Sequence, residues 1–258
     1  MQAADWLQIM GYMMLFVALG YGFYQLLPRA KPPAPAAPRP AGPARRTPAE
    51  WAVLADAAEG YAPGHAERVA MLAIALAEAI GLADQERAPL YQAALLHDVG
   101  EVDFEQALIH RAGPLTQSEL FRLWEHPTRG AQLALEITGN QSVSQWVRWS
   151  HERWDGLGYP DGLAGPAIPL PARILRLADS ADAMLHPRPY RDALTPEATL
   201  GEITRLAAVS YDPDLARIFA DVVLPQFIDD GGLETGRENP WADSPYAGEI
   251  ADAEPEAG

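Results

Sequence analysis

Apolar residues recur with a helical period along most of the chain between residues 47 and 227. The segment 65–81, HAERVAMLAIALAEAIG, spaces them three to four positions apart and ends at Gly81, as an amphipathic helix with a C-terminal glycine does. Residues 84–100 and 115–127 show the same period. Few stretches alternate apolar and polar residues, so we predict almost no strand. The pattern predicts an all-α domain.

Two capping boxes predict where helices begin. Thr47 and Glu50 flank a proline at the first helical position, and Thr116 and Glu119 repeat the spacing, which satisfies backbone N–H groups at a helix start. Asp84 is a further candidate cap. Later helices are predicted over residues 128–138, 142–153, 171–185, 196–208 and 213–226.

The N-terminal part has a different pattern, because residues 6–27 carry no charge. A helix of this length can cross the hydrocarbon core of a bilayer. Basic residues follow the stretch and none precedes it, so the positive-inside rule places the rest of the chain in the cytoplasm. We therefore predict one transmembrane helix that contacts lipid of the inner, cytoplasmic membrane as a single-pass anchor. A cleaved signal peptide and a buried helix are the alternatives.

Composition divides the chain into four parts. We predict an anchor over 1–27, a Pro- and Ala-rich linker over 28–47, a folded domain over 48–228 and an acidic tail over 229–258. Proline-rich sequence favours an extended linker. The tail combines acids with Gly, Pro and Ala, which predicts that it is disordered and solvated.

The residue types that are missing or in excess restrict the chemistry. The 258 residues include no cysteine, so disulfides and thiolate chemistry are excluded, and histidine and carboxylate are the available metal ligands. The formal net charge is −16, which argues against nucleic acid as a partner, because that binding needs clustered Lys and Arg. A small phosphate ester is still compatible, since bound cations reverse the field locally.

Four of the six histidines lie in short motifs that could carry chemistry. In chain order, the motif residues are His65 in GHAERV, His97 and Asp98 in LLHDVG, His126 in WEHPTRG, His151 in SHERWDGLGYP, and Asp179 in RLADSAD. Taken singly, each has an ordinary explanation as a cap, a core group or an ion-pair partner. The other two histidines, His110 and His186, lie in loop-like contexts and are expected to face solvent.

Taken together, these motifs in this order and spacing resemble the HD-GYP family of metal-dependent phosphodiesterases, a branch of the HD phosphohydrolases. The resemblance covers about 60–220 and includes AGPLT at 112–116, LAGPAIPLPARIL at 163–175 and RPYRDAL at 188–194. It implies an all-α, HD-domain helical bundle whose metal ligands come from separate helices. It also implies a substrate, cyclic di-GMP, which is opened to linear pGpG or GMP.

The resemblance further implies roles for individual residues. One divalent ion would be held by His65, His97, Asp98 and Asp179, and Asp98 would bridge to a second ion at His126 and His151. The candidate catalytic residues are Asp98 and Glu101, and the candidate substrate-binding residues are Gly158, Tyr159, Pro160 and Arg188. Imidazole and carboxylate ligands favour iron or manganese, at one or two ions per chain. Two such cations neutralise a phosphodiester and lower the pKa of water.

Some of these residues have competing interpretations. Tyr159 would stack on a guanine base or donate a hydrogen bond, or the Gly158–Pro160 loop is only a structural corner. Arg188 meets a phosphate or forms a structural salt bridge.

Two positions depart from the family pattern. Ser150 stands where the family has a second histidine; if residues 150 and 151 are helical, their side chains point about 100° apart, and the second ion binds less tightly. Glu101 stands where the family has lysine, and its carboxylate turns outward or joins the metal ligands. An alternative function is therefore a degenerate domain that binds cyclic di-GMP, a diguanylate cyclase or another signalling protein without turnover. An HD hydrolase acting on another nucleotide is a further alternative.

Overall fold

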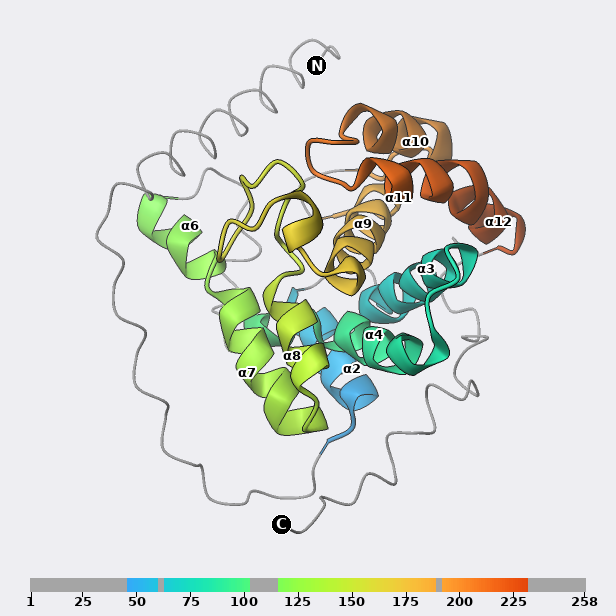
Figure 1. Ribbon diagram of the computed structural model, residues 1–258. Helices are drawn as coiled ribbons and strands as arrows, with labels where there is room; N and C mark the ends of the chain where they lie inside the picture. The colour runs from blue at the N-terminus through green and yellow to red at the C-terminus, as the bar shows by residue number, and fades with distance from the viewer. Residues whose placement is uncertain (1–45, 60–62, 103–115, 189–191, 232–258) are drawn as a thin grey trace. The chain divides into compact units, whose positions relative to one another are not determined.

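The computed structural model describes residues 46–59, 63–102, 116–188 and 192–231. These residues form helices joined by loops, and none of them belongs to a strand (Figure 1). No helix in the described ranges is long and apolar enough to cross a membrane. The predicted span over 6–27 lies outside these ranges, as do most of the predicted linker and tail.

The helices follow one another in the order that the apolar pattern predicts. They are α2 (Pro48–Glu59), α3 (His65–Ala79), α4 (Asp84–Leu96), the 3-10 turn η1 (Val99–Glu101), α6 (Gln117–Leu123), α7 (His126–Thr138), α8 (Gln141–Arg148), the 3-10 turn η2 (Gly165–Ala167), α9 (Leu170–Leu185), α10 (Pro196–Arg205), α11 (Pro213–Ile218), the π-helical η3 (Phe219–Val223) and α12 (Leu224–Asp229). The all-α prediction is thus confirmed for the described residues.

Both predicted capping boxes are present. The amide of Thr47 donates to the Glu50 carboxylate at 2.8 Å, and the Glu50 amide donates to the Thr47 hydroxyl at 3.3 Å. Thr116 and Glu119 form the same reciprocal pair. The prediction that Asp84 caps α4 was wrong, because Asp84 is already helical and its carboxylate instead lies 3.0 Å from an Arg87 guanidinium nitrogen.

The predicted helix over 142–153 ends earlier than expected. α8 stops at Arg148, and the chain then turns into a loop that extends to residue 164. The buried carboxylate of Glu152 accepts hydrogen bonds from the amides of Asp161, Gly162 and Leu163 at 2.7–3.0 Å. These bonds hold the loop folded back on itself and replace the bonds that a longer helix would make. Ser150 therefore lies outside the helix.

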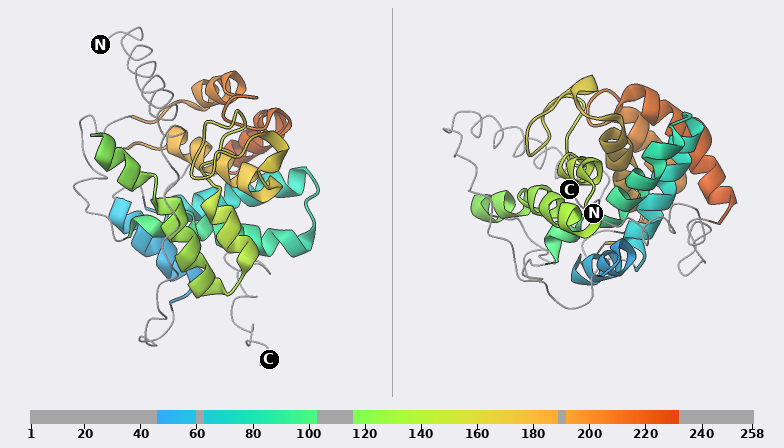
Figure 2. Two further views of the ribbon diagram at one scale, coloured as in Figure 1. Left: turned by 60° about the vertical axis from the view of Figure 1, so that its left-hand side comes forward. Right: turned by 60° about the horizontal axis from the view of Figure 1, so that its bottom comes forward.

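The core positions the three helices that carry the candidate ligands. α3 packs against α4 and α9, and the side chains of Leu72, Leu90 and Ile174, one from each helix, are fully buried. Each such side chain contributes about 1.5–3 kcal/mol on leaving water. α7 and α8 lie side by side as a second pair, in both Figure 1 and Figure 2.

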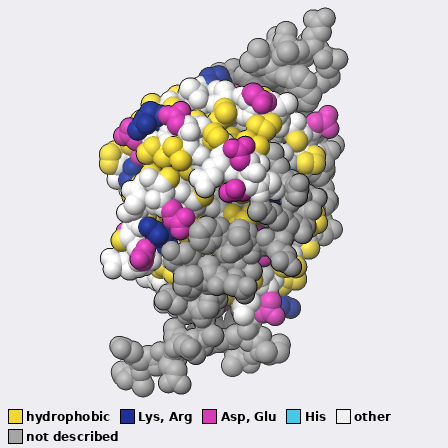
Figure 3. Space-filling view, turned by 90° about the vertical axis from the view of Figure 1, so that its right-hand side faces the viewer, with side chains coloured by type: hydrophobic (Ala, Val, Ile, Leu, Met, Phe, Trp, Pro, Cys, Tyr) yellow, Lys and Arg dark blue, Asp and Glu magenta, His cyan; other side chains and the backbone are white. Residues whose placement is uncertain are grey.

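One face of the described part has a mixed surface. Figure 3 shows acidic side chains interspersed with hydrophobic ones there, and no histidine is visible among its described side chains. Three of the histidines singled out from the sequence, His65, His97 and His126, are instead buried.

Gly158 is required by a close approach inside the loop. A Cβ atom at this position would lie 2.5 Å from the Cα of Glu152 and would also overlap the backbone of Arg153. Gly201, in α10, has open space around the same position. The two glycines therefore form a matched pair for substitution.

Gly158→Ala should lower the free energy of unfolding by about 1–3 kcal/mol, because the backbone must shift to admit a methyl group. Gly201→Ala should raise it by about 0.5–1 kcal/mol, since alanine favours a helix over glycine. Urea unfolding of the full chain, followed by circular dichroism, measures both. A Gly158→Ala variant as stable as the parent would contradict the close packing of this loop.

Candidate metal centre

Four helix ends converge on the middle of α9. His65 begins α3, His97 follows the last residue of α4, and His126 begins α7. His151 lies just beyond α8, and Asp179 lies inside α9. Side chains at helix ends can face one point from different directions, so these residues from distant parts of the sequence come together.

A first cluster consists of His65, His97 and Asp98, whose ligand atoms all lie within 4.8 Å of one another. Asp98 Oδ2 is 3.6 Å from His65 Nε2 and 2.9 Å from His97 Nε2. Asp179 Oδ1 adjoins the same point, 3.7 Å from His65 Nε2 and 3.8 Å from His97 Nε2. Ligand atoms about 2.1 Å from one ion are at most roughly 4.2 Å apart. These spacings therefore fit a shared cation.

A second cluster consists of Asp98, His126 and His151, again within 4.8 Å of one another. The other oxygen of Asp98, Oδ1, lies 3.7 Å from His126 Nε2. Asp98 thus belongs to both clusters and presents a different oxygen to each. This is the arrangement that a bridging carboxylate between two cations requires.

Hydrogen bonds on the far side of three rings leave their Nε2 atoms available as ligands. His65 Nδ1 contacts the Asp182 carboxylate, and His97 and His126 Nδ1 contact backbone carbonyls, each at 2.7 Å. Each contact favours the tautomer with the proton on Nδ1, so the lone pair lies on Nε2. All three lone pairs are therefore available for the clusters.

The electrostatics of the site favour the metal-ligating forms of Asp98, His126 and His151. His97 differs: burial lowers its pKa, but Asp98 and Asp179 outweigh burial and raise it, so a cation at the first cluster would have to displace the proton of that ring. Burial opposes ionisation of Asp98, but the imidazoles of His97, His65 and His126 outweigh it and hold the pKa of Asp98 well below its usual range. Burial lowers the pKa of His126, and burial together with His126 and Arg176 holds the pKa of His151 well below its usual value. A charged carboxylate and neutral imidazoles are the forms that bind divalent cations.

A further observation also indicates that these residues fit a divalent cation. The Nε2 atoms of His126 and His151 are buried and make no hydrogen bond within the described part of the chain. A buried polar atom without a partner costs free energy, and a cation would remove that cost.

Asp182 is a residue that sequence analysis missed. Its buried carboxylate contacts His65 Nδ1, Arg68 and His186, at 2.7–3.0 Å, and it orients the ligand His65. His186 is therefore buried, and the expectation that it faces solvent was wrong. The spacing of Asp179 and Asp182, three residues apart on one helix, places both on the same face and is the signal that could have identified Asp182. His110 lies outside the described residues.

Glu101 is largely buried beside the second cluster. Its carboxylate lies 3.5 Å from His126 Nδ1, the ring nitrogen opposite the candidate ligand atom, so it does not turn outward, and it also does not join either set of candidate ligands. Burial and the neighbouring Asp98 raise the pKa of Glu101 to about 8, while the charge of Arg188 acts in the opposite direction. Arg188 thus acts electrostatically on Glu101 from the segment that follows α9.

The second departure, Ser150, is turned away from ligand chemistry. Its side chain is buried, and its hydroxyl donates to the Val147 carbonyl at 2.9 Å. His151 joins the second cluster although residue 150 offers no imidazole.

The loop predicted to line a substrate cleft packs against the second cluster. The Tyr159 ring stacks on His151, with centroids 5.1 Å apart, and on Trp124, with centroids 5.4 Å apart. The Tyr159 amide also donates to the His151 carbonyl at 3.3 Å, while Gly158 is buried under the loop and Pro160 is half-buried beside it. Tyr159 is thus placed to support His151, and Trp124, which sequence analysis did not single out, supports Tyr159.

Comparisons with known proteins agree with this geometry. Residues 52–215 match the family model of the HD domain. The chain is 36% identical over 160 residues to the cyclic di-GMP phosphodiesterase response regulator RpfG of Xanthomonas campestris, covering 60% of this chain and 42% of RpfG. It is 35% identical over 142 residues to 3'3'-cGAMP-specific phosphodiesterase 1 of Vibrio cholerae, covering 55% of this chain and 33% of that protein. The chain thus spans less than half the length of these relatives.

The fold matches a solved structure as well. The crystal structure of a cyclic GMP-AMP-specific phosphodiesterase of Vibrio cholerae superposes with a TM-score of 0.54, over 72% of this chain and 49% of that one. The sequence identity is 23%, so this likeness concerns the fold alone. With its matching family model, its helical fold and its motifs, the chain belongs to the HD domain family, in the HD-GYP group.

Proposed function

We propose that this domain is a metal-dependent phosphodiesterase that hydrolyses cyclic di-GMP to pGpG or GMP. The observation that carries the proposal is the pair of clusters sharing Asp98, because each cluster offers one divalent cation a set of imidazole and carboxylate ligands. The similarity to RpfG, which is named a cyclic di-GMP phosphodiesterase, supports the substrate.

The chemistry of phosphodiester cleavage requires what these residues can provide. Two divalent cations, when bound, neutralise the phosphate oxygens and make water a strong nucleophile at neutral pH. The low pKa of Asp98 keeps its carboxylate charged for both clusters, and neutral His126 and His151 offer lone pairs. Tyr159 and Trp124 hold the ring of His151 in place from the side of the loop.

A second candidate substrate is 3'3'-cGAMP. It differs from cyclic di-GMP by one base, and a relative of similar identity is named for it. Parallel assays with the two dinucleotides distinguish the candidates, since a specific enzyme has a higher kcat/KM for one of them.

A receptor without turnover is not favoured. The second cluster keeps three candidate ligands although Ser150 replaces a histidine, and the relatives are named as phosphodiesterases.

The identity of the metal and the cellular location in this proposal are inferred from the sequence alone. Iron or manganese suits the ligands, and the uncharged stretch 6–27 would tether the domain to inner-membrane lipid on the cytoplasmic side.

The shared carboxylate gives a test by metal content. The full chain loaded with manganese or iron should hydrolyse cyclic di-GMP, and a chelator should abolish the activity. Asp98→Asn should lose cations from both clusters, whereas His126→Ala should retain the first, because that cluster does not use His126. Metal analysis and product chromatography measure the two effects.

The exposed carboxylate of Asp84 provides the control for this test. Asp84→Asn should change neither metal content nor activity. Full metal content and turnover in Asp98→Asn would refute the proposed function.

The charge of Glu101 should act in opposite directions on metal and substrate. Glu101→Gln removes a negative charge beside the second cluster, so the second cation should bind roughly tenfold more weakly, while KM at saturating metal should fall by a similar factor. Because the pKa of Glu101 is about 8 without a cation, the parent is more fully ionised above that pH. The difference in metal affinity should therefore grow as pH rises through about 8.

Calorimetric metal titration and steady-state kinetics measure these effects. Glu136→Gln, the same substitution at an exposed site on α7, is the control. If Glu101→Gln moved both affinities in the same direction, a purely electrostatic role for Glu101 would be excluded.

A further inference from the structure

Arg176 lies beside both clusters, and its contacts with their residues are long. It precedes Asp179 by three residues on α9, so both side chains leave the helix on the same face. Its Nη1 is 3.4 Å from His151 Nδ1 and 3.9 Å from Asp179 Oδ2. Its Nε is buried and makes no hydrogen bond to any described residue. The guanidinium therefore has N–H groups at the centre of the site that make no short hydrogen bond to the described residues.

Three other arginines of the domain make short bonds to aspartates. Arg68 makes two hydrogen bonds to one buried aspartate at 2.7 and 3.1 Å. Arg148 makes two to the exposed Asp161 at 2.8 Å, and Arg173 makes one to the buried Asp212 at 2.5 Å. Arg176 differs, because its contacts are at or beyond the limit of a good hydrogen bond.

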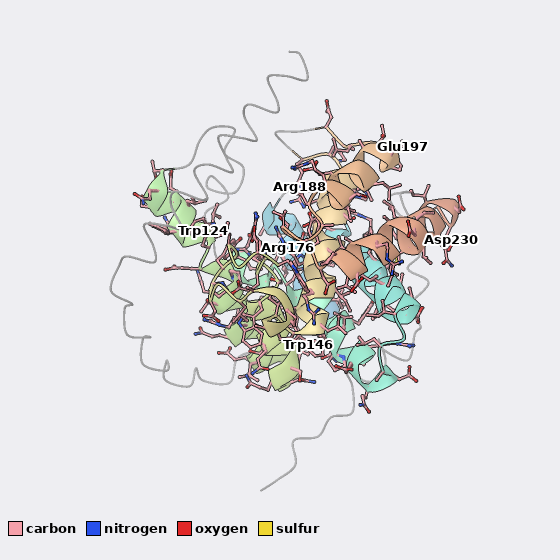
Figure 4. The ribbon with its side chains drawn as sticks, turned by 45° about the horizontal axis from the view of Figure 1, so that its top comes forward. Trp124, Trp146, Arg176, Arg188, Glu197 and Asp230 are labelled. Atoms are coloured by element: carbon pink, nitrogen blue, oxygen red, sulfur yellow. The ribbon has the colours of Figure 1, made fainter. Side chains whose placement is uncertain are left out.

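Arg176 is also placed to meet an anion. Its side chain is 23% exposed, so a ligand from solvent can reach it. In Figure 4 it lies at the centre of the view, between Trp124 on one side and the outer residues Glu197 and Asp230 on the other. Three carboxylates, of Asp98, Glu101 and Asp179, surround the site, so an anionic substrate needs a fixed cation here.

The contact with His151 does not compete with a ligand. Nδ1 of a neutral ring can accept from Arg176 only when the ring proton is on Nε2. If Nε2 holds a cation, the proton must be on Nδ1, which then no longer accepts. Binding of the second cation would therefore release Nη1 of Arg176 for an incoming oxygen.

We infer that Arg176 binds the phosphate group of the substrate, as a charge-assisted donor beside the two clusters. A planar guanidinium with several N–H groups matches two oxygens of one phosphate. The assignment rests on the proposed function for the identity of the substrate, but the affinity for a phosphate group can be measured alone.

The test uses the full chain loaded with manganese and inorganic phosphate as the probe. Calorimetry should give a phosphate affinity that falls about 10- to 100-fold in Arg176→Ala, since a hydrogen bond to a charged group is lost. The phosphate affinity of Arg176→Lys should lie between those of the parent and Arg176→Ala, because lysine keeps the charge and loses the planar guanidinium. Metal content should be unchanged in both, and kcat/KM for cyclic di-GMP should fall in the same order.

Arg205→Ala is the matched control, because Arg205 is exposed on α10 and pairs with Glu202; it should bind phosphate as the parent does. Equal phosphate affinity in the parent and Arg176→Ala would overturn the assignment, as would a parent that binds no phosphate. If circular dichroism shows that Arg176→Ala does not fold, the phosphate titration of Arg176→Lys decides: an affinity equal to that of the parent would overturn the assignment. A parent that binds phosphate through Arg176 but cleaves neither dinucleotide refutes the proposed function and leaves the assignment intact.

Discussion

The centre depends on one buried carboxylate being kept charged. Isolated in a protein interior, a carboxylate is neutralised rather than ionised, yet three imidazoles around Asp98 reverse that preference. Those imidazoles are in turn held by their Nδ1 contacts to a carboxylate and two backbone carbonyls. The ionised Asp98 and the oriented rings therefore stabilise one another, and neither arrangement would persist without the packing of α3, α4 and α7.

Sequence reasoning predicted the elements because the helical period and the capping boxes are local signals. It placed the start of α2 through Thr47 and Glu50, and it anticipated the absence of strands in what the structure describes. It missed the early end of α8, since the bonds of Glu152 to amides nine to eleven residues later compete with helix formation only once the loop is folded.

The candidate site was predictable as a set of motifs and not as a geometry. The contact between His65 and Asp182 joins residues 117 positions apart, and no local pattern reveals such a pair. Similarly, the inward orientation of Glu101 follows from burial beside α7 rather than from its neighbours in sequence. Arg176 escaped notice because an arginine at a helical position is ordinary until its partners are known.

The candidate ligands come from five separate segments, four of them helix ends, and this has a thermodynamic consequence. A cation held by such a set would act as a cross-link between these helices, in addition to their apolar contacts and the bonds of Asp182 to α3. Since the unfolded chain cannot hold these atoms together, the melting temperature should depend on the free metal concentration. The same residues would then determine both the reactivity of the domain and how firmly α7 is attached to the rest of it.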